Sequence, residues 1–306
     1  MRRVVLVQGA QQSEFFPWKK FISDPEAIAM VLEAQRLIEG THVDGQPLLL
    51  HTYCESCLTK DRNNLSPRYR VVAEHILLFV WSHLLWTRFP PQEKEGAVFL
   101  GQSYGLWIAA FLGGLRDFPT AVRLVTQRLL ICSAVPGDSI LVRKTDGIID
   151  FESLESLCKK YGDVWLSAIN HQCQCVISGA SESIEAILQT IREMNGYRKT
   201  QEINIGPSWH TPKLAYAAEQ VEQSFPSFDE LSDLRIPVLC LDSNGKLIQV
   251  RKKEEVVGHM LAELTEPRNF LGMALQLPGN VELVELCVHE KPFLTSTVNI
   301  IREKQH

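Results

Sequence analysis

The sequence predicts an α/β fold with a mostly parallel sheet and an inserted subdomain of the ferredoxin-like type. Short apolar runs typical of buried strands alternate with helix-forming segments along most of the chain. This alternation is the pattern of a mostly parallel sheet covered on both faces. Between residues 138 and 205 the expected order becomes βαββαβ, the order of a split βαβ unit. A compact unit of this kind within a longer α/β chain is typical of an insertion.

Length, composition and charge exclude several classes of protein. The chain has 306 residues, 45% of them hydrophobic, which is enough apolar material for a large core. A net charge of -5, without a Lys/Arg stripe interleaved with aromatic residues, argues against a nucleic-acid binder. No apolar run approaches the roughly 18 residues of a membrane span, and the N-terminal run is too short for a signal peptide. We therefore expect a cytoplasmic protein, with a monomer as the default.

The eight cysteines predict reduced thiols and no metal site. Scattered cysteines without a secretory signal are typical of a reducing compartment. His51, Cys54 and Cys57 in HTYCESC have the appearance of half a zinc site. A complete site needs a second pair with similar spacing, and the spacing of Cys173 and Cys175 is wrong for this.

The expected elements divide the chain into a core formed by 1–136 and 206–306 and a subdomain at 137–205. Before the subdomain we expect strands at 4–8 and 97–100 and helices at 66–88, 106–115 and 117–134. Within it we expect strands at 139–144, 163–170, 173–180 and 197–205 and helices at 151–161 and 181–195, the latter capped by Ser181. After it we expect helices at 211–225 and 256–264 and strands at 236–242 and 281–288.

The stretch Gly101-Gln102-Ser103-Tyr104-Gly105 predicts a nucleophile elbow. An expected buried strand precedes it, an expected helix follows it, and a glycine stands two residues to either side of Ser103. In such a strained turn a Cβ at either glycine would clash, and the serine hydroxyl stands above the edge of the sheet. We therefore predict that Ser103 is a nucleophile and that the Tyr104 amide points at a bound oxyanion.

A serine nucleophile needs a base and a second donor to the oxyanion. His210 is the best candidate base because it lies in an expected loop between a strand and a helix. His75 and His83, in contrast, fall within an apolar helical stretch. The second donor must come from another loop, and the strand that ends at Gln8-Gly9 allows a backbone amide to approach closely.

These motifs resemble, in their order, those of the malonyl-CoA:acyl-carrier-protein transacylase family, which includes the acyltransferase domains of polyketide and fatty-acid synthases. The resemblance runs over most of the chain and implies an α/β-hydrolase-like core with a ferredoxin-like insertion. It is carried by Val7-Gln8-Gly9-Ala10-Gln11, by GQSYGLWIAAFLGGLRDFPTAVRLVTQR from Gly101, by NHQCQCVISG from Asn170, by PSWH ending at His210 and by Leu264-Thr265-Glu266-Pro267-Arg268-Asn269-Phe270.

The resemblance implies roles for the catalytic residues. Ser103 and His210 would form a dyad rather than part of a triad. The backbone carbonyl of Glu263 would orient the histidine; a carboxylate at this position is unusual, and the role of its side chain is left open. The amides of Gln8 and Tyr104 would hold the oxyanion.

The resemblance also implies how the substrate is recognised. Arg128 would clamp the free carboxylate of malonate, because its planar fork can form a bidentate, charge-assisted pair. A neutral acyl chain would leave this arginine buried and unpaired. Trp209, Gln102 and Asn170 would belong to the substrate pocket. The bulky Trp209 ring favours malonyl over branched acyl groups, by on the order of 1–3 kcal/mol.

The implied activity is ping-pong transfer of a malonyl group from malonyl-CoA to the phosphopantetheine thiol of an acyl carrier protein, with no cofactor. Two alternatives stay open: a hydrolase of this fold that clears acyl groups from carrier proteins, and a non-catalytic relative that binds a carrier protein. Arg128 argues against the first, and the intact Ser103, His210 and Arg128 argue against the second. An unrelated serine esterase is a weaker option, since no acidic triad member can be assigned.

Several positions depart from the family pattern. Gln102 replaces the usual histidine beside the nucleophile, and Val72-Ala73 stand where a glutamine-proline pair is usual. The family's C-terminal G-P-G-x-x-L is absent. These changes around the pocket indicate a specialised relative, one that serves a polyketide or other secondary pathway.

Overall fold

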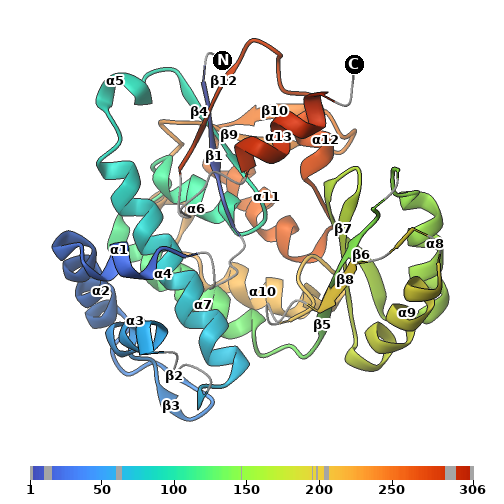
Figure 1. Cartoon of the computed structure of the whole chain (residues 1–306). Helices are drawn as coiled ribbons and strands as arrows, with labels where there is room; N and C mark the ends of the chain where they lie inside the picture. The colour runs from blue at the N-terminus through green and yellow to red at the C-terminus, as the bar shows by residue number, and fades with distance from the viewer. Residues whose placement is uncertain are drawn as a thin grey trace.

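Two five-stranded sheets organise the chain, one in the core and one in a smaller subdomain beside it (Figure 1). The computed structural model describes residues 3–9, 16–59, 64–145, 147–194, 196–197, 199–202, 207–286 and 294–303. Both sheets carry helices, so the α/β class predicted from the sequence is confirmed.

The core sheet is mostly parallel. In spatial order its strands are β10 (Leu247–Val250), β9 (Val238–Leu241), β4 (Ala97–Gly101), β1 (Arg3–Val7) and β12 (Glu282–Glu285). The last four run parallel, whereas β10 pairs antiparallel with β9 at the edge. Four strands match expected ones. Strand β10 was not expected, because its mostly half-exposed residues form no buried apolar run.

Apolar side chains are buried on both faces of this sheet. In β1, Val5 and Val7 join one hydrophobic cluster, whereas Val4 and Leu6 join another on the opposite face. The first cluster includes residues of α4 (Pro67–Thr87), α6 (Gly105–Leu112), α7 (Phe118–Cys132), α10 (Ala215–Ser224) and α11 (Lys253–Thr265). The second includes residues of α12 (Phe270–Leu275) and α13 (Leu294–Glu303). The predicted mostly parallel sheet, covered on both faces, is therefore confirmed.

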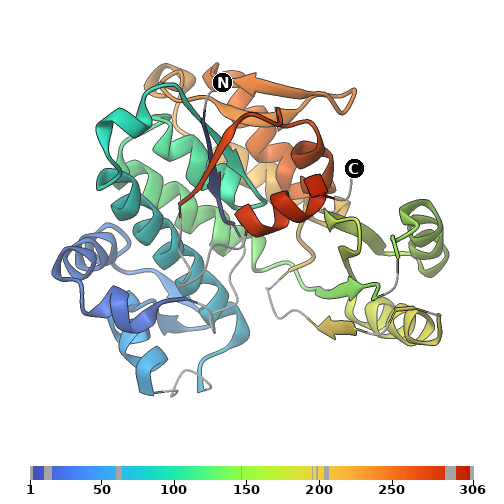
Figure 2. The same cartoon turned by 45° about the horizontal axis from the view of Figure 1, so that its top comes forward.

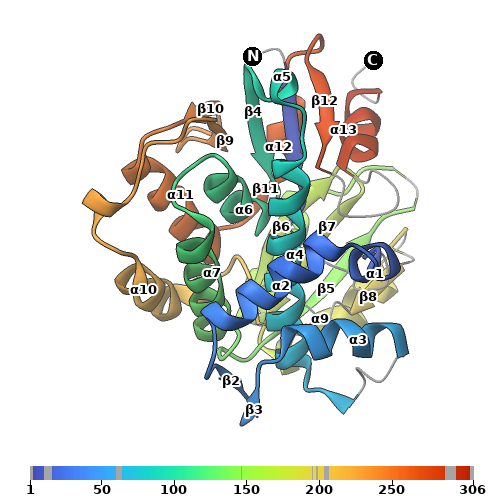
Figure 3. The same ribbon diagram turned by 90° about the vertical axis from the view of Figure 1, so that its left-hand side faces the viewer.

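The N-terminal helices form a layer that the sequence did not predict. They are α1 (Trp18–Ile22), α2 (Pro25–Leu37) and α3 (Leu50–Thr59), with a small hairpin of β2 (His42–Val43) and β3 (Gln46–Pro47). They pack against α4 (Figure 3), away from the subdomain (Figure 2). The Asp24 side chain caps α2 by accepting from the amides of Glu26 and Ala27. Shorter elements are α5 (Pro91–Lys94), η2 (Pro212–Leu214) and η3 (Phe228–Glu230).

No helix among the described residues has both the length and the apolar character that a membrane crossing requires.

The subdomain has the expected element order. It consists of β5 (Asp138–Arg143), α8 (Phe151–Tyr161), β6 (Val164–His171), β7 (Gln174–Gly179), α9 (Ser181–Glu193) and β8 (Lys199–Glu202). The prediction that Ser181 caps its second helix is wrong. Ala180 is the N-cap residue and provides no side-chain bond, while Ser181 already lies in the first turn.

The subdomain sheet also takes a strand from the second core segment. Strand β11 (Arg268–Asn269) pairs in parallel with β6, through Arg268 opposite Ala168 and Asn269 opposite Ile169. The final order is β11-β6-β7-β5-β8. The boundaries expected at 137 and 205 stay predictions.

Candidate active site

Ser103 lies in a strained turn between β4 and α6. Its φ is 54°, in the left-handed region that residues other than glycine seldom adopt. A Cβ on Gly101 would lie 2.3 Å from the carbonyl carbon of Gly105, and one on Gly105 would lie 2.2 Å from the Val7 oxygen. Only glycine fits at these two positions, as a nucleophile elbow requires.

The end of β1 packs against this turn. A Cβ on Gly9 would lie 2.0 Å from the Gln102 carbonyl oxygen and 2.6 Å from the Tyr104 amide nitrogen. Glycine therefore lets the two backbone segments approach more closely than any side chain would allow. The two segments from which the sequence predicted oxyanion donors, at Gln8 and Tyr104, meet beside the serine.

His210 is within hydrogen-bond distance of the Ser103 hydroxyl. Its Nε2 lies 2.6 Å from Ser103 Oγ, and its Nδ1 lies 2.5 Å from the backbone carbonyl oxygen of Glu263. A carbonyl oxygen can only accept, so Nδ1 carries the proton and Nε2 can receive the serine proton. The φ of His210 is 62°, so its backbone is also held in the left-handed region.

The surroundings of His210 favour its neutral form. Burial lowers the pKa of His210 below its ordinary value, although the carboxylate and the carbonyl of Glu263 each raise it in part. A neutral imidazole at neutral pH is the form that a general base requires.

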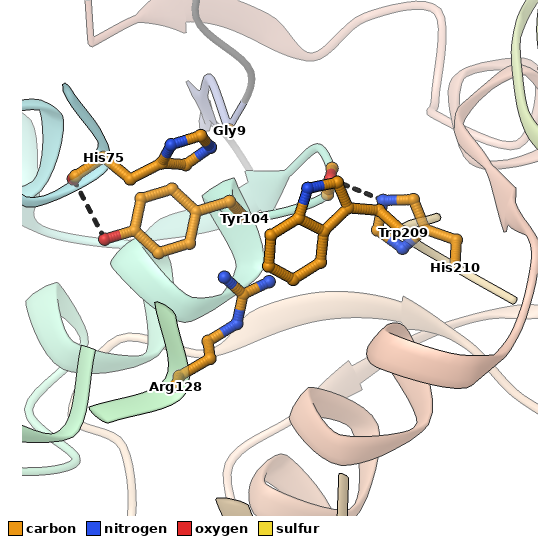
Figure 4. Close-up of a pocket in the computed structure, with 7 residues that line it drawn as sticks. Gly9, His75, Tyr104, Arg128, Trp209 and His210 are labelled. Atoms are coloured by element: carbon orange, nitrogen blue, oxygen red, sulfur yellow. Dashed lines mark hydrogen bonds between the residues drawn. The ribbon is translucent and has the colours of Figure 1, made fainter. Parts of the chain in front are cut away.

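Arg128 is caged by three aromatic rings. Its guanidinium carbon lies 4.6 Å from the ring centroid of Trp209 and 5.0 Å from those of Tyr104 and Trp107. The guanidinium points between the Tyr104 and Trp209 rings (Figure 4). Nη2 donates to Glu263 Oε2 at 3.3 Å, whereas Nε and Nη1 have no hydrogen-bond partner among the described residues. A buried donor without a partner costs about 1–3 kcal/mol, so the two nitrogens are suited to a ligand that accepts.

The Glu263 side chain is the part of the site that the sequence left unexplained. It is fully buried, and its Oε2 accepts a hydrogen bond from Trp107 Nε1 at 2.9 Å as well as the one from Arg128. Its Oε1 lies 3.3 Å from His210 Nδ1. Burial alone would raise the pKa of Glu263, but the charges of Arg128 and Arg268, the charge of His210 when it is protonated, and the Trp107 hydrogen bond together lower it. A charged carboxylate therefore lies between the base and the arginine.

A small cavity joins these groups. It has a volume of about 30 Å³ and is lined by Gly9, His75, Ser103, Tyr104, Arg128, Trp209 and His210. This is room for roughly one or two water molecules. The cavity therefore brings the expected nucleophile, base and arginine together.

His75 is a lining residue that the sequence did not single out. Its Nδ1 donates to the Val71 carbonyl one turn earlier in α4, at 2.7 Å, and its ring lies 5.0 Å from that of Tyr104. Burial lowers the pKa of His75 to about 4, so the ring is neutral. Its position in a long apolar helix hid it, because periodicity does not distinguish a cavity-facing residue from a core residue.

Gln102 and Asn170 do not line this cavity. Gln102 Nε2 donates to Asn170 Oδ1 at 2.9 Å, which connects the elbow to β6 of the subdomain. Their expected place in the substrate pocket stays a prediction.

Among the residues that the structure describes, no group of three or more His, Cys, Asp or Glu side chains could hold a metal ion.

The chain is similar in sequence to transacylases over part of its length. It is 23% identical over 192 residues to the malonyl CoA-acyl carrier protein transacylase of Bacillus subtilis, covering 61% of this chain and 46% of that protein. It is 25% identical over 161 residues to that of Synechocystis sp., covering 52% of each. A match of 143 residues at 25% identity covers 47% of this chain and 6% of the spectinabilin polyketide synthase system protein NorB of Streptomyces orinoci. The chain spans about half the length of the two transacylases, and no family model matches it.

Solved structures match the fold over nearly the whole chain. A malonyl-transacylase in complex with a type II polyketide synthase acyl-carrier protein aligns with a TM-score of 0.77 at 19% identity, covering 98% of this chain and 93% of that one. An acyl carrier protein S-malonyltransferase from Vibrio cholerae aligns with a TM-score of 0.76 at 18% identity, covering 99% and 94%. Fold and sequence together confirm the resemblance of this chain to the malonyl-CoA:acyl-carrier-protein transacylase family.

Proposed function

We propose that this protein transfers a malonyl group from malonyl-CoA to the phosphopantetheine thiol of an acyl carrier protein through a Ser103 acyl-enzyme. One observation carries the proposal. The Ser103–His210 pair, 2.6 Å apart, opens onto the same cavity as Arg128, whose Nε and Nη1 lack partners among the described residues. A nucleophile with its base and an unsatisfied guanidinium are the groups that malonyl transfer needs.

In the first half-reaction, CoA leaves and the enzyme is acylated. His210 Nε2 takes the Ser103 proton while Oγ attacks the thioester carbonyl carbon. The amides of Gln8 and Tyr104 hold the tetrahedral oxyanion. The carbon–sulfur bond then breaks, and the leaving CoA thiolate receives the proton from His210.

In the second half-reaction, the carrier protein collects the acyl group. Its phosphopantetheine thiol gives its proton to His210 Nε2, and the sulfur attacks the Ser103 ester carbonyl. The bond between that carbon and Oγ breaks, and Oγ takes the proton back. No redox step or further cofactor is needed.

Arg128 would hold the malonyl carboxylate during both steps. Either of its two unpaired nitrogens, Nε or Nη1, offers a hydrogen bond to a carboxylate, while Nη2 stays on Glu263. Trp209, stacked 4.6 Å from the guanidinium carbon, limits the room beside it. The cytoplasmic location expected from the sequence stays a prediction.

Intact-mass measurement tests the proposed reaction. The protein is incubated with malonyl-CoA, and we expect a stable malonyl adduct that moves to a holo carrier protein added later. The adduct should disappear in Ser103→Ala and persist in Ser181→Ala, a matched change at an exposed serine. Loss of the adduct to water, with no transfer to the carrier protein, would identify a hydrolase. No adduct in the wild type would refute the enzyme proposal.

A further inference from the structure

Three ionisable side chains form a continuous chain behind the nucleophile. Glu263 Oε1 lies 3.3 Å from His210 Nδ1, and Glu263 Oε2 accepts from Arg128 Nη2 at 3.3 Å. All three side chains are buried. Oε1 accepts no hydrogen bond from any described residue, so its contact with His210 is one of charge and position. One carboxylate thus contacts both the base and the arginine.

We infer that Glu263 determines acyl-group specificity by neutralising Arg128 from within the protein, so that the site accepts short uncharged acyl groups as well as malonyl. This inference rests on the proposed function. It also makes Glu263 a positioning residue for His210.

Charge balance is the first argument. Without Glu263, an acetyl group would leave the Arg128 guanidinium buried without an anion, which is costly. With Glu263 in place, the guanidinium already has a carboxylate partner and three rings around it. An uncharged acyl group therefore does not leave the buried Arg128 charge without a counterion. This changes the expectation from the sequence that a neutral acyl chain would leave Arg128 unpaired.

The same neutralisation of Arg128 by Glu263 weakens the attraction between Arg128 and the malonyl carboxylate. That carboxylate can still accept a hydrogen bond from Nε or from Nη1 of Arg128. It would, however, be the second anion beside one buried cation, and like charges that share a low-dielectric site disfavour each other. Malonyl therefore gains a hydrogen bond without the full attraction of an unneutralised arginine.

The size of the cavity limits the acyl group to short chains. The cavity of about 30 Å³ is lined by Trp209 and Tyr104, whose rings lie to either side of the Arg128 guanidinium (Figure 4). Because this space holds only about one or two water molecules, an acyl group can enter only if the lining side chains move apart, and we expect chains longer than malonyl, which need the most room, not to load Ser103.

Glu263 also acts on the base. The charged groups that act on His210 are Glu263 from α11, Arg128 from α7 and Arg268 from β11, and only Glu263 is negative. Removing that charge leaves two cations beside the imidazole, which disfavours its protonated form. The acid limb of the pH–rate profile should then move to lower pH.

Glu263→Gln tests the inference, because it removes the charge and keeps the shape. We measure the rates of Ser103 loading by malonyl-CoA and acetyl-CoA, by intact mass, from pH 5 to 8. The malonyl-to-acetyl ratio should rise about tenfold, because the malonyl carboxylate is then the only anion beside Arg128. The acid limb should move down by about 1 pH unit. Glu266→Gln, at an exposed glutamate after the end of the same helix, should change neither quantity.

The outcomes separate the inference from the proposed function. If both loading rates fall by one common factor, with ratio and pH profile unchanged, Glu263 has only a structural role and the inference is wrong. A wild type that loads with neither acyl-CoA refutes the proposed function, and the inference with it. If Glu263→Gln does not fold, as judged by thermal melting, Glu263→Asp replaces it. Its carboxylate is withdrawn from Arg128 by one methylene and should raise the ratio, and an unchanged ratio there refutes the inference.

Discussion

Arg128 shows how a single side chain can combine two roles. Its charge is stabilised inside the protein by Glu263 and by three aromatic rings, while two of its nitrogens stay available toward the cavity. A guanidinium can do both at once because its donors point in fixed, separate directions. A lysine at this position would provide the charge but not the planar fork.

Arg128→Lys should therefore lower malonyl loading selectively. The ammonium keeps a partner for Glu263, so the variant avoids a stranded buried carboxylate. Loss of the fork should slow malonyl loading of Ser103 roughly tenfold while acetyl loading stays within about threefold. Intact-mass time courses with the two acyl-CoAs measure this, and Arg123→Lys, at an exposed position of the same helix, is the control. Equal loss with both substrates would show that Arg128 does not contact the malonyl carboxylate.

Secondary-structure elements were predicted well where the sequence carries buried apolar runs. The strands β1 and β4 and the helix α4 lie within about two residues of their expected bounds. The helices α1 to α3 were missed, because their burial comes from packing against α4 rather than from a strong apolar pattern of their own. The sequence also did not predict that His75 and the Glu263 carboxylate belong to the site, because a helical pattern does not show which polar side chain faces a cavity.

Gly9 tests the contact between β1 and the elbow. A Cβ on Gly9 would lie 2.0 Å from the backbone oxygen of Gln102 and 2.6 Å from the backbone nitrogen of Tyr104. Backbone atoms of the elbow cannot move away without distorting the turn. Gly9→Ala should lower the free energy of unfolding by about 3 kcal/mol and abolish Ser103 loading. Urea unfolding and intact mass give the two values. The control is Gly279→Ala, which has open space around it and should change neither the free energy of unfolding nor the loading of Ser103. Gly45→Ala would be a poor control, because its φ is positive. A Gly9→Ala protein with wild-type loading would show that the approach of the two segments is not required.

At the scale of the whole molecule, stability depends on two histidines of α4 that the fold keeps neutral, the buried His75 and the half-buried His83. Burial lowers the pKa of His75 to about 4 and that of His83 to about 4. The ring of His83 lies 4.7 Å from that of Phe118 and 6.2 Å from that of Phe79. In the unfolded chain both imidazoles titrate near 6.5, so between these values the unfolded state binds more protons than the folded state.

Stability should therefore fall as pH is lowered from 6.5 toward 4. Each histidine contributes up to about 3 kcal/mol to this loss, since one pKa unit corresponds to about 1.4 kcal/mol. Urea unfolding at pH 7 and pH 5 measures the change. His83→Phe should flatten the dependence, whereas His42→Gln, at an exposed position, should not alter it. A profile for His83→Phe that matches the wild type would contradict this account.

The pairing of β11 with β6 has a mechanical consequence. Strand β11 begins at Arg268, five positions after Glu263 in the chain, and its backbone is bonded into the subdomain sheet. A rotation of the subdomain about the core must either break this pairing or pull on the end of the helix that holds the acceptor for His210. The two-residue strand would therefore couple the position of His210 to the orientation of the subdomain, although neither His210 nor Ser103 belongs to the subdomain.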